Sequence, residues 1–146
     1  MKKLLLIFLM LLLYSPTSFS CSCKLKSVEE SFSDSKAVLL IEVQKLEVVR
    51  NEDNGTIKYL EAKFKTVESI MAADNDINVL RTYSNCGLDL YPSQKYLVYV
   101  PKESTVENYV SRCHGSFKYL PQVEYTRAKL DAVRKFAHNK SMKKGT

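Results

Sequence analysis

The sequence has little of what enzymes and membrane-spanning proteins use. Only two histidines occur, His114 and His138, and the carboxylates are scattered. We find no metal-ligand spacing, phosphate-binding loop or Ser/His/Asp set. Cys113 and His114 could be imagined as a nucleophile and its base, but neighbours in sequence point to opposite faces of a strand. We therefore expect neither an enzyme nor a metal site of its own. The longest apolar run, Leu4–Leu13, has ten residues, whereas a transmembrane helix needs about 20.

The first twenty residues have the features of a secretory signal. Lys2 and Lys3 precede the apolar run, and Ser18 and Ser20 are the small residues at −3 and −1 before Cys21. Cleavage before Cys21 would leave 126 residues, enough for one domain, and would lower the formal net charge from +6 to +4. We expect a protein secreted to the extracellular space, or to the periplasm, without nucleic acid as a partner.

Cys21 also leaves open the alternative of a bacterial lipoprotein, in which the first mature cysteine is acylated. The usual lipobox has Leu at −3 and a small residue at −2, where this sequence has Ser18 and Phe19. Acylation would anchor the protein to a membrane and block the α-amino group of Cys21. Without acylation, we expect no membrane partner and a monomer.

One helix and five strands are predicted in the first part of the mature chain. Ser27-Val28-Glu29-Glu30 is a capping box, which starts a short helix through about Ser33 with Phe32 as its core anchor. Asp53-Asn54-Gly55 predicts a type I′ turn between the first two strands. Aliphatic runs, alternation and turn residues place the strands at about 37–49, 57–70, 77–83, 95–100 and 106–112.

The C-terminal segment predicts a helix followed by a tail. Pro121 suits a first helical turn, and apolar residues recur at three- and four-residue steps as far as about Phe136. Residues 138–146 are basic and polar, so we expect them to be flexible. The domain organisation is then a signal peptide at 1–20, one domain at 21–137 and a basic flexible tail at 138–146.

Five strands with flanking helices indicate a mainly β fold. An OB-fold-like Greek-key barrel has this number of strands, with a short N-terminal helix and a C-terminal helix added to it. The strand pattern alone does not separate such a barrel from a sandwich.

Four cysteines in an exported chain indicate disulfides. They allow three pairings, of which Cys21–Cys23 is disfavoured because so small a ring strains the bond. Both N-terminal cysteines would then reach Cys86 and Cys113, in one order or the other. Such bridges could simply pin a loose end, or they could hold the terminus rigid as a probe.

Several motifs, in order along the mature chain, resemble those of the tissue inhibitors of metalloproteinases, within the wider netrin-like group. Members of this family begin their mature chain with Cys-Ser/Thr-Cys, and a Phe follows nine residues after the second cysteine. The corresponding segments here are Cys21-Ser22-Cys23, Phe32, Cys86-Gly87-Leu88, Tyr96-Leu97-Val98 and Val110-Ser111-Arg112-Cys113.

The resemblance implies an OB-like barrel with the bridges Cys21–Cys86 and Cys23–Cys113. It also implies inhibition of a zinc metalloproteinase, because the α-amino nitrogen and carbonyl oxygen of Cys21 would chelate the catalytic zinc of the target. The protein would need no cofactor, since that zinc belongs to the protease. The inhibitory contact edge would comprise Cys21, Ser22, Cys23, Lys24, Ser84, Asn85 and Cys86.

Two other functions remain as alternatives. A netrin-like binding module or periplasmic lipoprotein could use the same barrel without touching zinc. Nucleic-acid binding follows only by analogy with other OB folds, and export argues against it. The state of the Cys21 amine separates inhibition from the first alternative, because a free amine permits chelation and an acylated or extended one prevents it.

Overall fold

A computed structural model describes residues 23–24, 26–71, 77–83 and 86–144. Within these ranges five strands form one antiparallel sheet in the order β3-β2-β1-β4-β5. Their bounds are β1 Ser35–Arg50, β2 Ile57–Met71, β3 Val79–Thr82, β4 Lys95–Pro101 and β5 Phe117–Tyr119. The predicted mainly β class with five strands is confirmed. The sheet is not closed, because β3 and β5 lie at its opposite edges.

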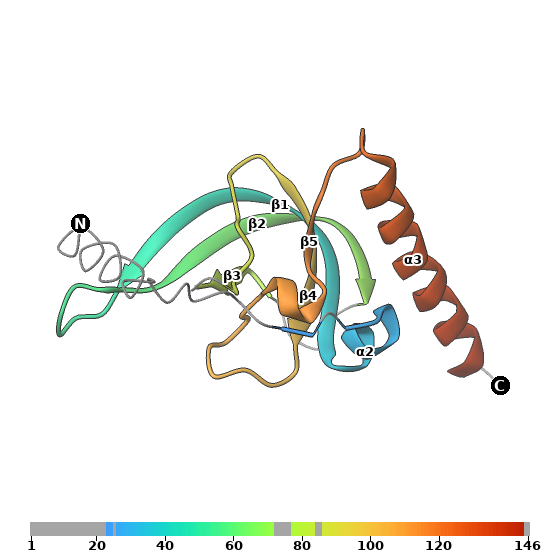
Figure 1. Ribbon diagram of the computed structural model, residues 1–146, viewed down its shortest axis with the longest axis horizontal. Helices are drawn as coiled ribbons and strands as arrows, with labels where there is room; N and C mark the ends of the chain where they lie inside the picture. The colour runs from blue at the N-terminus through green and yellow to red at the C-terminus, as the bar shows by residue number, and fades with distance from the viewer. Residues whose placement is uncertain (1–22, 25, 72–76, 84–85, 145–146) are drawn as a thin grey trace, which may run out of the picture.

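The first two strands are long and curved, as Figure 1 shows. Their antiparallel ladder changes register at four places, between Val38 and Leu39, Leu40 and Ile41, Val43 and Lys45, and Val49 and Arg50. Extra residues in one strand of a pair bend it and increase its twist. The irregular ladder is therefore the physical reason that this pair arches over the rest of the molecule.

Two apolar clusters pack on opposite faces of the sheet because successive side chains of β1 and β4 alternate between them. One cluster contains Ala37, Leu39, Ile41, Val43, Ala62, Leu80, Leu88, Leu90, Tyr96, Val98, Val100 and Val110. The other contains Phe32, Val38, Leu40, Leu97, Tyr99, Leu130 and Val133. The second cluster joins the sheet to the helices α2 (Val28–Ser33) and α3 (Glu124–Lys144). Both helices lie at the same end of the molecule in Figure 1.

The predicted fifth strand at 106–112 is wrong. Among the described residues this segment makes two isolated bridges, Arg81 with Tyr109 and Gly87 with Ser111, and then turns into the short 3₁₀ helix η1 (Arg112–His114). Asn108 takes a left-handed backbone conformation with φ of 53°, which interrupts an extended strand. The edge strand β5 instead lies further on and pairs with β4.

Two further expectations are corrected. The β1–β2 turn is not a two-residue type I′ turn: Asn51 and Thr56 close a four-residue loop, in which only Gly55 has positive φ, of 67°. Helix α3 begins after Pro121, at Glu124, and continues to Lys144 rather than ending near Phe136. Most of the expected tail is therefore helical, because adding residues to a helix that is already nucleated costs little and needs no buried face, and four of residues 138–144 are the helix-favouring lysine or methionine.

Candidate functional site

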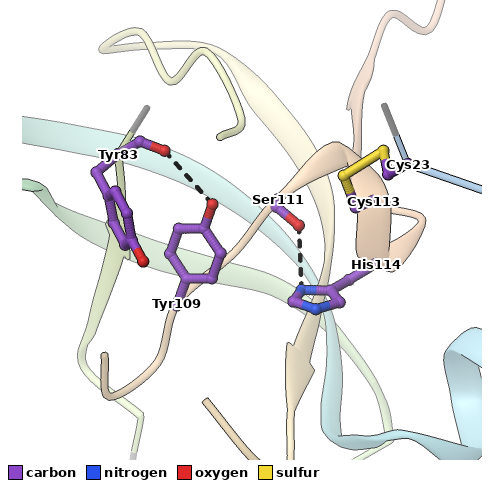
Figure 2. Close-up of a disulfide and its surroundings, with 6 residues drawn as sticks. All are labelled: Cys23, Tyr83, Tyr109, Ser111, Cys113 and His114. Atoms are coloured by element: carbon purple, nitrogen blue, oxygen red, sulfur yellow. Dashed lines mark hydrogen bonds between the residues drawn. A yellow bond between two sulfur atoms is a disulfide. The ribbon is translucent and has the colours of Figure 1, made fainter. Parts of the chain in front are cut away.

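A disulfide joins Cys23 to Cys113, as the family resemblance implied. The two Cα atoms lie 5.5 Å apart although the residues are 90 positions apart in sequence. Cys113 is the central residue of η1, and Figure 2 shows Ser111 and His114 beside it. The bond therefore fixes the start of the described chain to η1, in the connection between β4 and β5.

Cys86 is also disulfide-bonded. Its expected partner Cys21 lies outside the described residues, as do three other residues of the expected contact edge, Ser22, Ser84 and Asn85. The pairing of Cys21 with Cys86 therefore stays a prediction. Of the expected edge, the structure describes Cys23, Lys24 and Cys86, of which the first two are exposed and the third is partly buried.

Gly87 brings the Cys86 segment close to the Cys113 segment. It forms an antiparallel bridge with Ser111, two residues before Cys113. A Cβ atom at position 87 would lie 2.4 Å from the Thr82 hydroxyl oxygen and 2.8 Å from the Tyr83 carbonyl oxygen, so only glycine fits without a shift of the backbone. The next residue, Leu88, donates its N–H to the same Thr82 hydroxyl at 2.9 Å.

Two tyrosines pack beside this bridge, and the sequence analysis did not single them out. The rings of Tyr83 and Tyr109 lie with their centroids 4.8 Å apart, and the Tyr109 hydroxyl donates to the Tyr83 carbonyl oxygen at 3.4 Å. Both are labelled in Figure 2. The only sequence signal was the two-residue spacing of Tyr109, Ser111 and Cys113, which places these residues on one face of an extended segment.

His114 lies against the same group of residues. Its Nδ1 atom is 3.1 Å from the Ser111 hydroxyl, and its ring meets Tyr109 edge-on at 6.1 Å between centroids. Burial lowers the pKa of His114 below its ordinary value of 6.5, and the nearby charge of Lys26 lowers the pKa further. His114 is therefore neutral at pH 7. Its sequence neighbour Cys113 is held in the disulfide and is no nucleophile.

The segment after Cys23 is held by a helix cap and an ion pair. The predicted capping box is confirmed: the Ser27 N–H donates to the Glu30 carboxylate at 2.8 Å, and the Glu30 N–H donates to the Ser27 hydroxyl at 3.2 Å. The Lys26 ammonium lies 2.7 Å from the Asp34 carboxylate. These contacts fix the path of the chain from the disulfide into α2.

The described residues include no group of three or more His, Cys, Asp or Glu side chains placed to hold a metal ion. No helix in this part of the chain is both long and apolar enough to cross a membrane. No protein-family model matches the sequence, and a search of the curated proteins also gives no match.

Proposed function

We propose that the protein is a secreted inhibitor of zinc metalloproteinases, similar to the tissue inhibitors of metalloproteinases. One observation carries the proposal. The Cys23–Cys113 disulfide holds the chain two residues after the expected mature terminus, while the Gly87–Ser111 bridge brings Cys86 to the same place. A terminus held in this way loses little conformational entropy when it docks.

The inhibitory chemistry would come from Cys21. Its α-amino nitrogen and carbonyl oxygen would occupy the position that a catalytic zinc keeps open for water, and would displace the water that attacks the peptide bond. An α-amino group has a pKa of about 8, so its deprotonation beside Zn²⁺ needs little free energy near neutral pH. Ser22 would enter the pocket beside the metal, and Lys24, Ser84 and Asn85 would flank it.

The second bridge of this proposal joins Cys21 to Cys86. Cys86 is disulfide-bonded, and the bond between Cys23 and Cys113 leaves Cys21 as the remaining cysteine of the four in the sequence. Two disulfides also favour an exported protein, because thiols are kept reduced in the cytosol.

An OB-like, Greek-key arrangement is the fold we propose for this inhibitor. In support, β1 pairs with both β2 and β4, and the segment after β4 returns to the free edge of β3. There the Arg81 N–H donates to the Asn108 carbonyl at 3.0 Å, and the Val110 N–H donates to the Arg81 carbonyl at 2.8 Å. This short parallel contact extends the pairing of the sheet beyond β3.

The alternative is a netrin-like binding module or periplasmic lipoprotein that does not inhibit proteases. The intact mass of the exported protein, measured without reduction, separates the two. We expect the mass of residues 21–146 less four hydrogens, which corresponds to two disulfides and a free amine. A mass increased by acyl chains would make Cys21 an anchor and would exclude chelation. A protein with the expected mass should then inhibit at least one member of a panel of zinc metalloproteinases.

A further inference from the structure

A cavity of about 520 Å³ lies between the two helices and the segment that links η1 to β5. Its walls come from α2, from residues 88–91, from β4, from residues 112–118 and from α3. Sites for small ligands have volumes of about 300–1,000 Å³. The cavity is therefore large enough for a small organic molecule, and its described lining includes none of Cys23, Lys24 and Cys86.

The wall of the cavity is mostly apolar, and Tyr99 is one of the buried residues with a hydroxyl group in it. Val133, Phe117 and Tyr99 contribute to it, and only 2% of Tyr99 is exposed. The backbone N–H of Tyr99 in β4 donates to the hydroxyl of Ser116 at 2.9 Å, just before β5 begins. Burial alone raises the pKa of Tyr99 to about 12, so its hydroxyl keeps its proton and can donate a hydrogen bond.

Four basic side chains line the same cavity, and they differ in how their charges are compensated. Lys26 is paired with Asp34, and Arg112 with Asp89. Lys118 and Lys129 make no ion pair among the described residues. Instead, the Lys118 ammonium lies 5.8 Å from the centre of the Tyr91 ring, and the Lys129 ammonium lies 4.3 Å from that of Phe117. The cavity therefore combines apolar walls with two positive charges that lack a carboxylate.

We propose that this cavity binds a small amphipathic carboxylate, with its apolar body against Tyr99, Phe117 and Val133 and its carboxylate at Lys118 and Lys129. An ammonium group that contacts only an aromatic ring is less stabilised than one that a carboxylate also contacts. The bound carboxylate would therefore stabilise the ammonium groups of both Lys118 and Lys129. This site does not depend on the proposed inhibition, since the described residues that line it include neither Cys23 nor Cys86.

Octanoate is a suitable probe, and titration calorimetry with the exported protein measures its binding. Octan-1-ol has the same apolar body without the charge, and octylammonium carries the opposite charge. We expect octanoate to bind with one site per protein, and about fivefold or more tighter than octan-1-ol, the effect of one partly screened charge contact. Octylammonium should bind more weakly than either. Absence of saturable octanoate binding, or equal binding of octan-1-ol, would overturn the proposal.

Three substitutions on α3 locate the site. Lys129→Gln should weaken octanoate binding by about fivefold, whereas Lys135→Gln, which removes an exposed lysine of the same helix outside the cavity, should leave it unchanged. Ala132→Phe places a ring in the cavity from an exposed position and should abolish binding. Circular dichroism and thermal unfolding confirm that each variant is folded. If folded Ala132→Phe binds octanoate as the parent does, the ligand binds elsewhere and the inference is wrong.

Discussion

Gly87 and His114 show how single residues shape the surroundings of the disulfide. Gly87 permits a backbone approach that no side chain allows, and His114 is a titratable ring held neutral between Ser111, Tyr109 and Lys26. Both residues lie one position from a disulfide-bonded cysteine, Cys86 and Cys113 respectively. Their substitution therefore tests the local geometry without removing a bridge.

Gly87→Ala should lower the free energy of unfolding by about 1–3 kcal/mol, because the new methyl group would overlap the Thr82 hydroxyl and the Tyr83 carbonyl. Denaturant titration measures this change. Gly55→Asn is the control: position 55, unlike position 87, has positive φ, but a Cβ there meets nothing within 4 Å, and asparagine tolerates this conformation. Equal losses in the two variants would contradict close approach as the reason for glycine at position 87.

His114 should make the protein less stable as the pH falls. The pKa of His114 is lowered in the folded state, so the unfolded chain binds a proton more readily below about pH 6.5. The contribution of His114 is therefore complete above that pH and is lost as the pH falls toward the folded-state pKa. Unfolding titrations at about pH 7.5 and about pH 5.5 measure the loss.

Two variants provide the comparison for this pH dependence. His114→Gln should reduce the loss of stability between the two pH values, because glutamine does not titrate. His138→Gln, which changes an exposed histidine of α3, should retain it. An identical pH dependence in the parent and in His114→Gln would contradict the assignment.

The local signals of the sequence were reliable where short-range contacts determine the structure. The capping box at Ser27 and Glu30 formed as predicted because both hydrogen bonds lie within one turn. The close approach of Gly87 could not be predicted, since it depends on Thr82 and Tyr83 as they are placed by the sheet. His114 was considered only as a catalytic base, because its burial depends on the tertiary fold and the charge of Lys26 that lowers its pKa is distant in sequence.

At the scale of elements, the helices and the disulfide attach separate parts of the chain to one sheet. Helix α3 packs through Leu130 and Val133 against the face that also receives Phe32 from α2. The disulfide attaches the segment before α2 to η1. Each attachment can be weakened independently, because the two involve different residues.

Leu130→Ala should lower the free energy of unfolding by about 2–4 kcal/mol, because Leu130 is only 1% exposed and its removal leaves a cavity between α3 and the sheet. Thermal and denaturant unfolding measure the change. Met142→Ala, which truncates a side chain of the same helix that is 60% exposed, should change stability by less than about 0.5 kcal/mol. Similar effects of both substitutions would mean that α3 is not held by its buried face.

Replacing both Cys23 and Cys113 by alanine should lower stability by up to about 4–5 kcal/mol, the chain-entropy value for a loop closed over 90 residues. Denaturant unfolding of parent and variant measures the difference, and intact mass verifies that the Cys86 bridge remains. The proposed inhibition should also weaken in the folded variant, because the terminus would lose one of the two disulfides that the proposal gives it. A folded variant with undiminished inhibition would show that this disulfide serves stability alone.

The sequence predicted most strands to within about three residues, because β1, β2 and β4 are long apolar or alternating runs. It failed at residues 106–112, where the left-handed Asn108 and the η1 turn replace a strand. The predicted end of α3 was also too early, because the spacing of apolar residues indicates only the part of a helix that has a buried face. The order of the disulfides could not be obtained from spacing, and came from the family resemblance.

The whole molecule is one open sheet whose two ends differ. The β1–β2 turn lies at one end in Figure 1, and the helices lie at the other. The Cys23–Cys113 bond and the Gly87–Ser111 bridge bring segments far apart in sequence to one region. The proposed inhibition depends on the chain terminus near this region, whereas the proposed carboxylate site is the cavity between the two helices and the segment that links η1 to β5. Failure of one proposal would leave the other standing.

The most direct test of the proposed inhibition compares two forms of the mature protein that differ by one residue. One form begins with Cys21, and the other carries an additional alanine ahead of it, which removes the free amine from the chelating position. Both should have the same unfolding midpoint. We predict that the extended form inhibits a susceptible zinc metalloproteinase at least about 100-fold more weakly, equivalent to about 3 kcal/mol of lost binding. Equal inhibition by the two forms would contradict chelation by Cys21.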